Sequence, residues 1–486
     1  MHSELREEKL RKLQLLKDAG IDPYPSRVRR THTLAEARAQ FSDLVRSGKR
    51  IAVVGRVMSI RDQGKMVFVD LVDESGRMQV VLRKDATARF ALIKSVLDRG
   101  DFAAARGTLF LTKRGEKSIS ARTFSLVAKS ILPLPPEWYG IEQTEIRLRK
   151  QYLDFLFRPE ERELVYKKAV FWESIRAFLK REGFLEVATP VFETTPGGAE
   201  AEPFRTHYNA LDTDFFLRIS LELPLKKLLV GGFEKVFEIG RIFRNEGIDR
   251  EHLQDYTQLE FYWAYRDYHD LMRFVEKMYR EVIRKVCGSL VTHWQGKKID
   301  WGKKWKKLEY SELFYKANKI MPKDATLAQL RSRARELGIK VENYYRKGRL
   351  LDLIFKKTVR PKLIQPSFLL NPPVEIEPLA KRLPDRPWLV QRMQVMACGT
   401  ELGKGFSELN DPLDQRARFE EQMRLRSAGD KEAQRIDEEY LEAMEYGMPP
   451  SAGFGLSERL FAVLMDRPLR ETILFPPVRP KNRGAE

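Results

Sequence analysis

The spacing of hydrophobic residues predicts helices and then short strands in the N-terminal part of the chain. Between residues 4 and 19, leucines alternate with charged residues as in an amphipathic helix, which the breaker cluster at residues 20–25 ends. A second short helix is predicted over residues 33–46. The period then changes to the alternation typical of strands separated by turns. The predicted strands cover residues 51–60, 66–72, 78–82, 102–111 and 119–127.

This strand pattern predicts a small barrel of the OB-fold type. Five short strands with one helix between the third and the fourth, here at residues 86–97, are typical of that fold, which binds single-stranded nucleic acid. The proline-rich residues 132–137 then form a stiff, extended connector. The predicted domains are therefore residues 1–135, with N-terminal helices and the barrel, and residues 136–486.

The second predicted domain mixes helices and strands. A helix is predicted over residues 160–182, and a strand at residues 184–190 follows it and runs into a proline. Another apolar, strand-like run occupies residues 236–240. Further helices are predicted over residues 270–287 and 326–337.

Composition indicates a large globular protein with an anionic partner. A chain of 486 residues predicts two or three domains, and 43% hydrophobic with 32% charged residues is typical of soluble globular proteins. A net charge of +19 and a pI near 9.6 make nucleic acid the first candidate partner. Within residues 290–360, tryptophans alternate with lysines. This stretch either contacts a nucleic-acid backbone or, as we favour, forms a solvated hairpin with buried tryptophans.

Cysteine usage and hydropathy predict a cytoplasmic protein. Cys287 and Cys398 lie far apart and form no CxxC motif, so neither a zinc site nor a disulfide framework is expected. The N-terminus is charged from Glu4 onward, unlike a signal peptide. No apolar run approaches the roughly 20 residues that a membrane span needs.

Residues 243–262 concentrate the candidate chemistry. They directly follow a strand-like run and bring arginines, acids, a histidine and aromatic residues into a short span. A planar arginine fork can bridge two anions at once. The pattern therefore suits a clamp for anionic groups, and the alternative is a hairpin with ordinary surface charges.

This segment resembles motif 2 of the class II aminoacyl-tRNA synthetases and is most similar to that of the lysyl-tRNA synthetase family. Residues 184–190 resemble the strand of motif 1, residues 453–459 resemble motif 3, and further matches in family order cover nearly the whole chain. Neither a P-loop nor a class I synthetase signature is present. The resemblance implies an α+β protein: an N-terminal OB-fold β-barrel that binds the anticodon, plus a class II catalytic domain. That domain would hold an antiparallel sheet flanked by helices and an insertion around residues 290–360.

The resemblance also implies the ATP-dependent attachment of lysine to tRNA(Lys) through a lysyl-adenylate. ATP is then a substrate, Mg²⁺ the cofactor, and a homodimer the assembly. Two alternatives stay open. One is an aspartyl- or asparaginyl-tRNA synthetase, against which Glu260 and Glu408 argue because an acidic pocket repels aspartate. The other is a catalytically silent paralogue that binds RNA or a partner.

The residues that would handle ATP are carried over by the resemblance. Arg244 would lie between the α-phosphate and the amino-acid carboxylate, and Arg459 would lie on the γ-phosphate side. These two arginines are the implied catalytic residues, because such chemistry relies on positioning and charge neutralisation. The implied ATP-binding set is Arg244, Glu246, His252, Tyr256, Glu401 and Arg459.

The resemblance also implies a lysine pocket and an anticodon-binding face. Glu260 and Glu408 would pair with the ε-ammonium, with Tyr262 adding a hydroxyl; the alternative for either glutamate is pairing with a nearby lysine or arginine of the chain. In the barrel, Phe68 would stack on an anticodon base, Gln79 would read a uridine edge and Arg61 would hold backbone or base. The implied lysine-binding set is Gly198, Glu222, Arg244, Glu260, Tyr262, Lys404 and Glu408, with Gly198 and Glu222 at the α-amino group.

Three positions depart from the family pattern. Lys404 stands where asparagine is usual, and two positive charges about 4 Å apart repel by ~4 kcal/mol at an effective dielectric near 20. Lys404 must therefore turn away, pair with an acid or change the substrate, and we expect it to turn away from bound lysine. Gln394 stands where a metal-binding glutamate is frequent, so Gln394 and Glu401 are the implied Mg²⁺ ligands and a weaker Mg²⁺ dependence is expected. Residues 453–459 are one residue shorter than the usual motif 3, which leaves the register of its glycines open.

Overall fold

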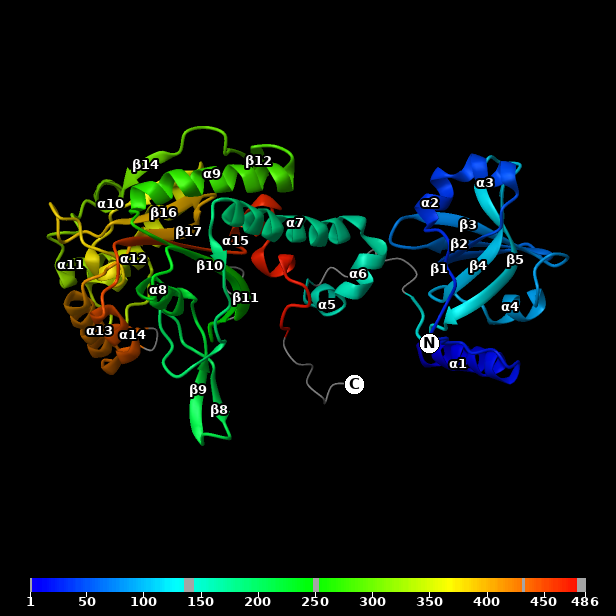
Figure 1. The fold of residues 1–486 in the computed structure, drawn as a ribbon, viewed down its shortest axis with the longest axis horizontal. Helices are drawn as coiled ribbons and strands as arrows, with labels where there is room; N and C mark the ends of the chain where they lie inside the picture. The colour runs from blue at the N-terminus through cyan, green and yellow to red at the C-terminus, as the bar shows by residue number, and fades with distance from the viewer. Residues whose placement is uncertain (1, 135–143, 248–252, 431–432, 479–486) are drawn as a thin grey trace. The chain divides into compact units, whose positions relative to one another are not determined.

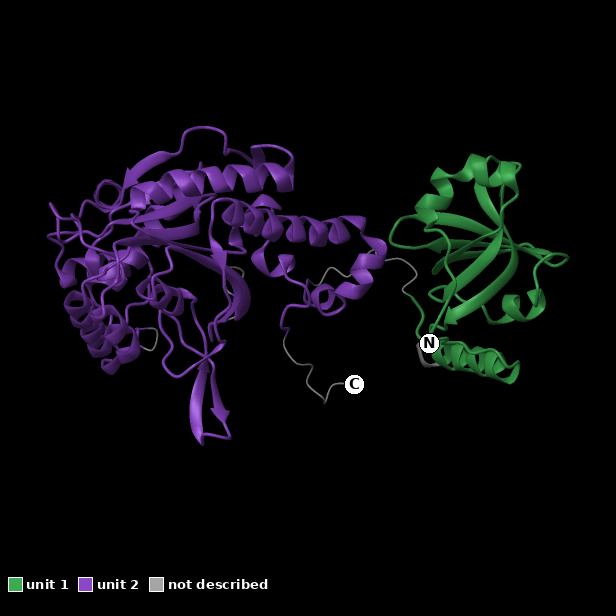
Figure 2. Cartoon of the chain, in the orientation of Figure 1, with its two compact units in different colours: residues 1–140 green, residues 141–486 purple. Residues whose placement is uncertain are grey.

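The chain folds into two compact units. The computed structural model describes residues 2–134, 144–247, 253–430 and 433–478. The units are residues 1–140 and residues 141–486 (Figure 2). The expected domain boundary between residues 135 and 136 lies outside the described residues.

The first unit is built on a closed five-stranded barrel with the order β1-β2-β3-β5-β4. Alternate residues such as Val67, Val69 and Leu71 are fully buried and fill its interior, as the period of a strand requires. The predicted OB-fold is thereby confirmed, with its helix between the third and fourth strands. The bounds are β1 (Ile51–Asp62), β2 (Met66–Val72), β3 (Arg77–Arg83), α4 (Phe90–Val96), β4 (Phe102–Leu111) and β5 (Lys117–Ala128).

Three helices precede the barrel. The first, α1 (His2–Asp18), matches the predicted amphipathic helix. The helix predicted over residues 33–46 is in fact two, α2 (Leu34–Ala39) and α3 (Phe41–Ser47). The prediction was wrong here because Gln40 departs from α-helical geometry (φ −90°, ψ 14°). The apolar spacing does not reveal such a break.

The second unit is organised around an eight-stranded sheet with the order β14-β15-β16-β17-β18-β11-β10-β6. The central pairs are antiparallel, as predicted, whereas the two edge pairs, β14–β15 and β10–β6, are parallel. The strands are β6 (Leu185–Glu186), β10 (Lys235–Phe243), β11 (Asp255–Ala264), β14 (Lys306–Glu309), β15 (Ser367–Leu370), β16 (Arg392–Ala397), β17 (Thr400–Ser407) and β18 (Ser451–Ser457).

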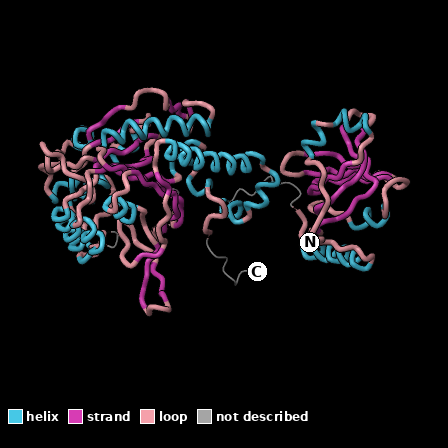
Figure 3. The backbone as a smooth tube through the Cα atoms, viewed as in Figure 1, coloured by secondary structure: helices cyan, strands magenta, loops and turns pink. Residues whose placement is uncertain are grey.

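Helices cover both faces of this sheet (Figure 3). On β11, Leu259 and Phe261 are fully buried in the core shared with α7 and α9, whereas Tyr262 packs with α8 on the opposite face. Because side chains alternate along a strand, Glu260 also points to the α8 face. The flanking helices are α7 (Pro159–Arg181), α8 (Glu222–Val230), α9 (Tyr268–Cys287), α13 (Pro412–Ser427), α14 (Glu438–Glu445) and α15 (Arg459–Leu464).

Local sequence determines the ends of α9, which packs with α7 in one core. Asp267 and Asp270 form a capping box at its start, and each satisfies an amide that would otherwise lack a partner. Gly288 ends the helix in the left-handed conformation (φ 71°), which glycine adopts without strain. The helix predicted from residue 270 therefore begins slightly earlier, at Tyr268.

The insertion at residues 290–360 packs against the main unit. Trp301 and Trp305 are 0% and 3% exposed and lie in the core shared with α9, which agrees with the favoured hairpin with buried tryptophans. The helix predicted over residues 326–337 is present as α11. The insertion holds β12 (Val291–Trp294), β13 (Lys297–Asp300), α10 (Tyr310–Asn318), α11 (Leu327–Glu336) and α12 (Lys347–Thr358).

The remaining elements are short. A hairpin of β8 and β9 projects from the second unit (Figure 1). The short elements are α5 (Thr144–Arg149), α6 (Gln151–Phe157), β7 (Phe192–Glu193), β8 (Arg205–Tyr208), β9 (Thr213–Leu217), and the 3-10 helices η1 (Arg360–Lys362), η2 (Val374–Ile376) and η3 (Leu469–Thr472).

Across the described parts of the chain, no helix combines the length and apolarity needed to cross a membrane.

Candidate active site

A cavity of about 300 Å³ lies on the α8 face of the sheet. Its floor is a row of residues paired directly across four strands: Glu260 on β11, Gly455 on β18, Lys404 on β17 and Gln394 on β16. Directly paired residues point to the same face of a sheet. The register therefore aligns three predicted site residues that are far apart in the sequence.

Glycines on β18 make room for this cavity. Gly453 pairs with Tyr262 and Phe406, and a Cβ at Gly453 would overlap the Tyr262 ring and a carboxylate oxygen of Glu408. Gly455 lies between Glu260 and Lys404 in the floor, and both glycines line the cavity. The register of the shortened motif 3, which the sequence left open, is thus set by strand pairing.

Glu260 is 3% exposed, and neutral donors hold its carboxylate. Its Oε1 accepts hydrogen bonds from Ser220 Oγ (2.7 Å), the Leu221 amide (3.0 Å) and Gln258 Nε2 (2.5 Å). Its Oε2 accepts from the Tyr262 hydroxyl (2.9 Å). These donors satisfy the anion without cancelling its charge.

Glu222 and Glu408 share one buried lysine. The Lys226 ammonium, 0% exposed, pairs with Glu222 Oε1 (2.5 Å) and with Glu408 Oε2. Burial lowers the pKa of Lys226, but the two carboxylates outweigh it and hold that pKa well above its ordinary value. For Glu408, the alternative of pairing with a lysine of the chain is therefore present in this structure.

The charges of this cluster do not balance. Glu222 and Glu408 pair with the ammonium of Lys226, whereas Glu260 is held by neutral donors, so these three carboxylates and this ammonium together carry an excess of two negative charges when all are ionised. Burial, opposed by Lys226, raises the pKa of Glu222 to about 7. Burial likewise raises the pKa of Glu408 well above its ordinary value. The cluster therefore favours a ligand that brings positive charge.

Two arginines and a tyrosine form the other side of the cavity. The Arg244 guanidinium lies 5.8 Å from the centre of the Tyr256 ring, and its Nε donates to the Ile219 carbonyl (3.1 Å). Arg459 donates to the Glu401 carbonyl (3.3 Å). Burial, opposed by both guanidinium groups, raises the pKa of Tyr256. These residues therefore lie around one ring at the edge of the cavity.

Of the described ATP-binding residues that the resemblance implies, Glu246 does not line the cavity. Glu246 is half-buried in the turn after β10, and its amide donates to the Arg244 carbonyl (2.8 Å). His252 lies outside the described residues. Their roles toward ATP stay predictions.

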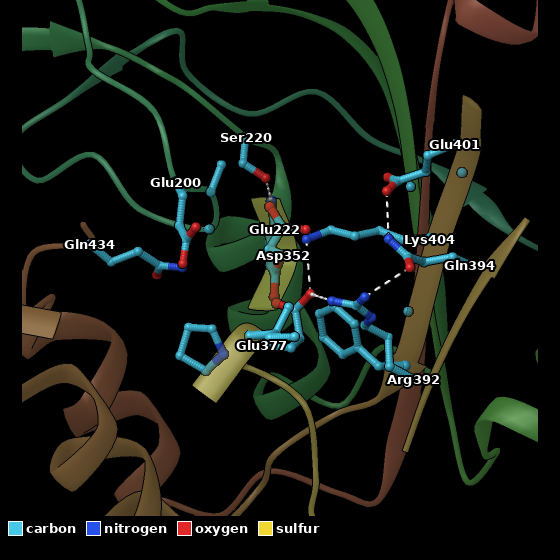
Figure 4. Close-up of a pocket in the computed structure, with 18 of the residues that line it drawn as sticks. Glu200, Ser220, Glu222, Asp352, Glu377, Arg392, Gln394, Glu401, Lys404 and Gln434 are labelled. Atoms are coloured by element: carbon cyan, nitrogen blue, oxygen red, sulfur yellow. Dashed lines mark hydrogen bonds and ion pairs between the residues drawn. The ribbon is translucent and has the colours of Figure 1, made fainter. Parts of the chain in front are cut away.

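Lys404 does not turn away from the cavity, and this expectation needs correction. Its side chain lines the cavity, and its ammonium donates to Glu377 Oε2 (3.0 Å), as Figure 4 shows. Arg392 donates to the same oxygen (3.2 Å). Burial raises the pKa of Glu377, but Lys404 and Arg392 outweigh it and hold that pKa below its ordinary value. A buried carboxylate therefore keeps the lysine inside the cavity.

Gln394 does not fit the expected role of a Mg²⁺ ligand. Its Oε1 accepts from Arg392 (2.8 Å), so its Nε2 donates to Glu401 Oε2 (2.5 Å) (Figure 4). The amide thus presents hydrogens, not an oxygen, to its partner carboxylate. Among the described residues, no group of three or more His, Cys, Asp or Glu side chains suits a metal ion.

A β-bulge brings Glu401 to this network. Along a regular strand, Glu401 and Lys404 would point to opposite faces because they are three residues apart. The pairing with β16 shifts by one residue between Val395 and Met396, which places an extra residue in β17. Glu401 therefore joins Lys404 on the cavity side.

Gly198 lies beside Glu222 in the cavity wall. It has a φ of +81°, and a Cβ there would lie 2.9 Å from Glu222 Cβ and 3.0 Å from Ser220 Cβ. Only glycine suits both the backbone conformation and the space. The predicted neighbours Gly198 and Glu222 are thus together in the structure.

Sequence reasoning missed the residues that hold the site in place. Lys226 follows Glu222 by four positions on α8, a spacing that brings side chains together and was detectable. The partners of Lys404 offered no such signal, because they come from separate segments. The missed residues are Ser220, Lys226, Gln258, Glu377 and Arg392, with Arg349 and Asp352 of α12 in the cavity wall.

The three predicted anticodon-binding residues share the outer face of the barrel. Arg61 pairs directly with Phe68, and Gln79 pairs with Asp70, two residues further along β2. Phe68 is half-buried, whereas its neighbours on β2 point inward. Gln79 is largely buried, and its side-chain oxygen accepts from Ser118 Oγ (3.0 Å).

Sequence comparison agrees with both units. The class II tRNA synthetases (D, K and N) match residues 143–479, and the OB-fold nucleic acid binding domain matches residues 51–134. The chain therefore belongs to the class II tRNA synthetases of the D, K and N group.

Three similar relatives within that family all carry the name lysine–tRNA ligase. The chain is 44% identical over 485 residues to the lysine–tRNA ligase of Roseiflexus castenholzii, covering 99% of each chain. It is also 44% identical over 484 residues to the lysine–tRNA ligase of Moorella thermoacetica, covering 99% of this chain and 98% of the relative. The lysine–tRNA ligase of Synechococcus sp. (strain RCC307) is 41% identical over 492 residues, with 99% and 97% covered.

Filling the space at Gly453 should close the cavity. We expect Gly453→Ala to push the Tyr262 ring and the Glu408 carboxylate out of place, because the added methyl would overlap both. Amino-acid-dependent ATP–pyrophosphate exchange should fall by about 10²-fold or more, since ~1 Å misplacement alone costs that much. Gly76→Ala is the control: that glycine lies outside the cavity, has no positive φ and has open space around its Cβ position. Equal activity of Gly453→Ala and wild type would contradict the packing described.

Proposed function

We propose that this protein attaches lysine to tRNA(Lys) through a lysyl-adenylate, with ATP as the second substrate. The observation that carries the proposal is the charge excess in the cavity wall: Glu222 and Glu408 share Lys226, and Glu260 has only neutral donors. Free lysine brings two ammonium groups, which would balance that excess. The printed names of the relatives, which match over nearly the full chain, support the same reaction.

The residues suggest how lysine would lie. Its ε-ammonium would face Glu260 and Tyr262, where neutral donors hold an unbalanced carboxylate. Its α-amino group would face Glu222 beside Gly198, and its carboxylate would face Arg244. This orientation follows the cavity from its acidic end to its arginine end.

The reaction needs little more than positioning and neutralised charge. A lysine carboxylate oxygen would form a bond to the α-phosphorus of ATP while the bond from that phosphorus to the bridging oxygen breaks, and pyrophosphate leaves. Arg244 and Arg459 would stabilise the phosphate charges, and Tyr256 would stack on the adenine. A terminal ribose hydroxyl of the tRNA would then take the lysyl group, and AMP would leave.

Mg²⁺ enters this proposal with ATP. Nucleotide phosphates commonly carry the ion into such sites, with one or two protein carboxylates adding ligands. Glu401 is the carboxylate that would contact it, whereas Gln394 is engaged with Arg392 and does not fit. The ion would supply positive charge to the phosphates.

The outer face of the barrel would bind the anticodon. Phe68 would provide a stacking surface, and Arg61 and Gln79 lie beside it on the same face. We also propose a homodimer, which the resemblance of α7 and the following strand to motif 1 supports. Tyr166 and Val170 on α7 are 54% and 43% exposed, which suits a face that a second copy covers.

Amino-acid-dependent ATP–pyrophosphate exchange across all twenty amino acids tests the function. We expect exchange with lysine alone, and we expect Glu260→Gln to lower kcat/KM for lysine by about 10³-fold or more, because a site built for a cation loses its charge. Exchange with aspartate or asparagine would instead support the related synthetases. Silence with every amino acid would support the catalytically silent paralogue.

The affinity for lysine should depend on pH near neutrality. Glu222, with a pKa raised to about 7 in the empty pocket, is ionised above that pH and neutral below it. Because only the ionised carboxylate attracts an ammonium, the dissociation constant of lysine should fall by about tenfold from pH 6 to pH 8. Calorimetric titration of lysine without ATP measures it. Glu222→Gln should bind lysine more weakly and without this step; a step of equal size in that variant would rule out Glu222 as its source.

If the barrel binds the anticodon, a change at Phe68 should affect the transfer of lysine to tRNA but not the formation of lysyl-adenylate. Phe68→Ala should lower lysylation of tRNA(Lys) by about tenfold or more, since loss of base stacking costs ~1–3 kcal/mol. It should leave lysine-dependent pyrophosphate exchange unchanged, because that step uses only the second unit. Leu111→Ala, at a 58% exposed position of β4, is the control. A Phe68→Ala protein that lysylates tRNA normally would remove this residue from the interface.

A further inference from the structure

The Gln394–Glu401 pair, where a protein-bound Mg²⁺ was expected, is closed by hydrogen bonds. Arg392 donates to Gln394 Oε1 (2.8 Å), and Gln394 Nε2 donates to Glu401 Oε2 (2.5 Å). Three side chains thus form a chain of donors and acceptors that fixes which end of the amide faces Glu401. A metal ion between Gln394 and Glu401 would have to break both contacts.

A fixed cation lies next to this closed pair. Lys404 is the direct cross-strand neighbour of Gln394, and Glu377 holds its ammonium at 3.0 Å. Glu377 is 3% exposed and also accepts from Arg392, so its position is determined from two sides. The Lys404 ammonium is therefore anchored inside the cavity.

The position of this ammonium is between the two halves of the site. Lys404 interacts electrostatically with Glu401 on the phosphate side and with Glu222 on the amino-acid side. Figure 4 shows its side chain extending from β17 across the cavity toward Glu222. The bond between carboxylate and α-phosphate would form in this region, where negative charge gathers in the transition state.

The two departures at these positions act in the same electrostatic direction. Glutamine in place of the expected glutamate removes one negative charge, and lysine in place of the expected asparagine adds one positive charge. Together they make this part of the cavity more positive by two charges, which is the charge of one Mg²⁺. The closed hydrogen bonds at Gln394 and the anchored Lys404 are therefore complementary changes.

We infer that Lys404, anchored by Glu377, replaces a protein-bound Mg²⁺ at Gln394 and Glu401 as a cation of the adenylation step. The enzyme then uses only the Mg²⁺ that ATP itself carries. This inference rests on the proposed function, and it assigns to Lys404 a catalytic role. Lys404 transfers no proton: it stabilises the negative charge that forms as the carboxylate bonds to the α-phosphorus and pyrophosphate leaves.

Counting bound metal tests the replacement directly. Mn²⁺ bound to the protein in the presence of the β,γ-imido analogue of ATP can be counted by electron paramagnetic resonance. We expect one Mn²⁺ per site in the wild type. The double variant Gln394→Glu, Lys404→Asn should bind one more, as should Gln394→Glu alone if the double variant fails to fold. Two ions in the wild type, or no additional ion in either variant, would overturn the inference.

Kinetics test the catalytic role. Lys404→Met should lower kcat of lysine-dependent pyrophosphate exchange by about 10²-fold to 10³-fold, as the loss of one preorganised charge donor does elsewhere. The KM values for lysine and ATP should stay within about threefold. Lys277→Met is the control, because Lys277 also pairs with a glutamate (2.7 Å to Glu182) but lies on the surface. A loss confined to the KM for lysine would assign Lys404 to substrate selection instead.

The Mg²⁺ dependence of the same reaction tests the replacement through an activity that is regained rather than lost. The exchange rate of the wild type should stop rising once the Mg²⁺ concentration equals the ATP concentration. The double variant should need free Mg²⁺ beyond that concentration, and its exchange rate should then exceed that of Lys404→Asn by at least about tenfold. Identical Mg²⁺ curves would contradict the replacement. A wild type without lysine-dependent exchange would refute the proposed function, while the Mn²⁺ count, which needs only the nucleotide analogue, would still decide the question of the metal.

Discussion

The site depends on a buried carboxylate for which the protein supplies hydrogen bonds but no balancing charge. Four neutral donors hold Glu260 at 3% exposure, and Glu222 and Glu408 already share the ammonium of Lys226. Hydrogen bonds make the burial of an anion tolerable, yet they leave its field uncancelled in a region of low dielectric. A ligand with two ammonium groups removes this imbalance, and a neutral or acidic amino acid does not.

The sheet allows this arrangement because its register and its glycines are matched. The row from Glu260 through Gly455 to Lys404 places an acid and a base on opposite sides of a glycine, which has no side chain. Gly453 leaves space for the Tyr262 ring in the same way. Side chains at these two positions of β18 would fill the cavity. The short motif 3 therefore contributes to the site mainly through glycines, which leave this space open.

Much of the fold and part of the site could be predicted from the sequence. Strand periodicity gave the five strands of the barrel, and the resemblance placed Arg244, Tyr256, Glu260 and Glu401 in one site, where the structure also has them. The sequence allowed Lys404 to pair with an acid, but it could not show that this acid is Glu377. Nor could it show that Gln394 is engaged by Arg392, or that α12 contributes to the wall. These contacts join segments far apart in the chain, and local patterns carry no information on them.

The central claim is that the uncancelled charge of the acidic cluster selects the substrate. It is tested most directly by comparing lysine with norleucine, which has the same carbon chain without the ε-ammonium, in ATP–pyrophosphate exchange. We expect kcat/KM for norleucine to be about 10⁴-fold lower, because Glu260 would then stay buried without a cation. A difference of less than about tenfold would contradict it.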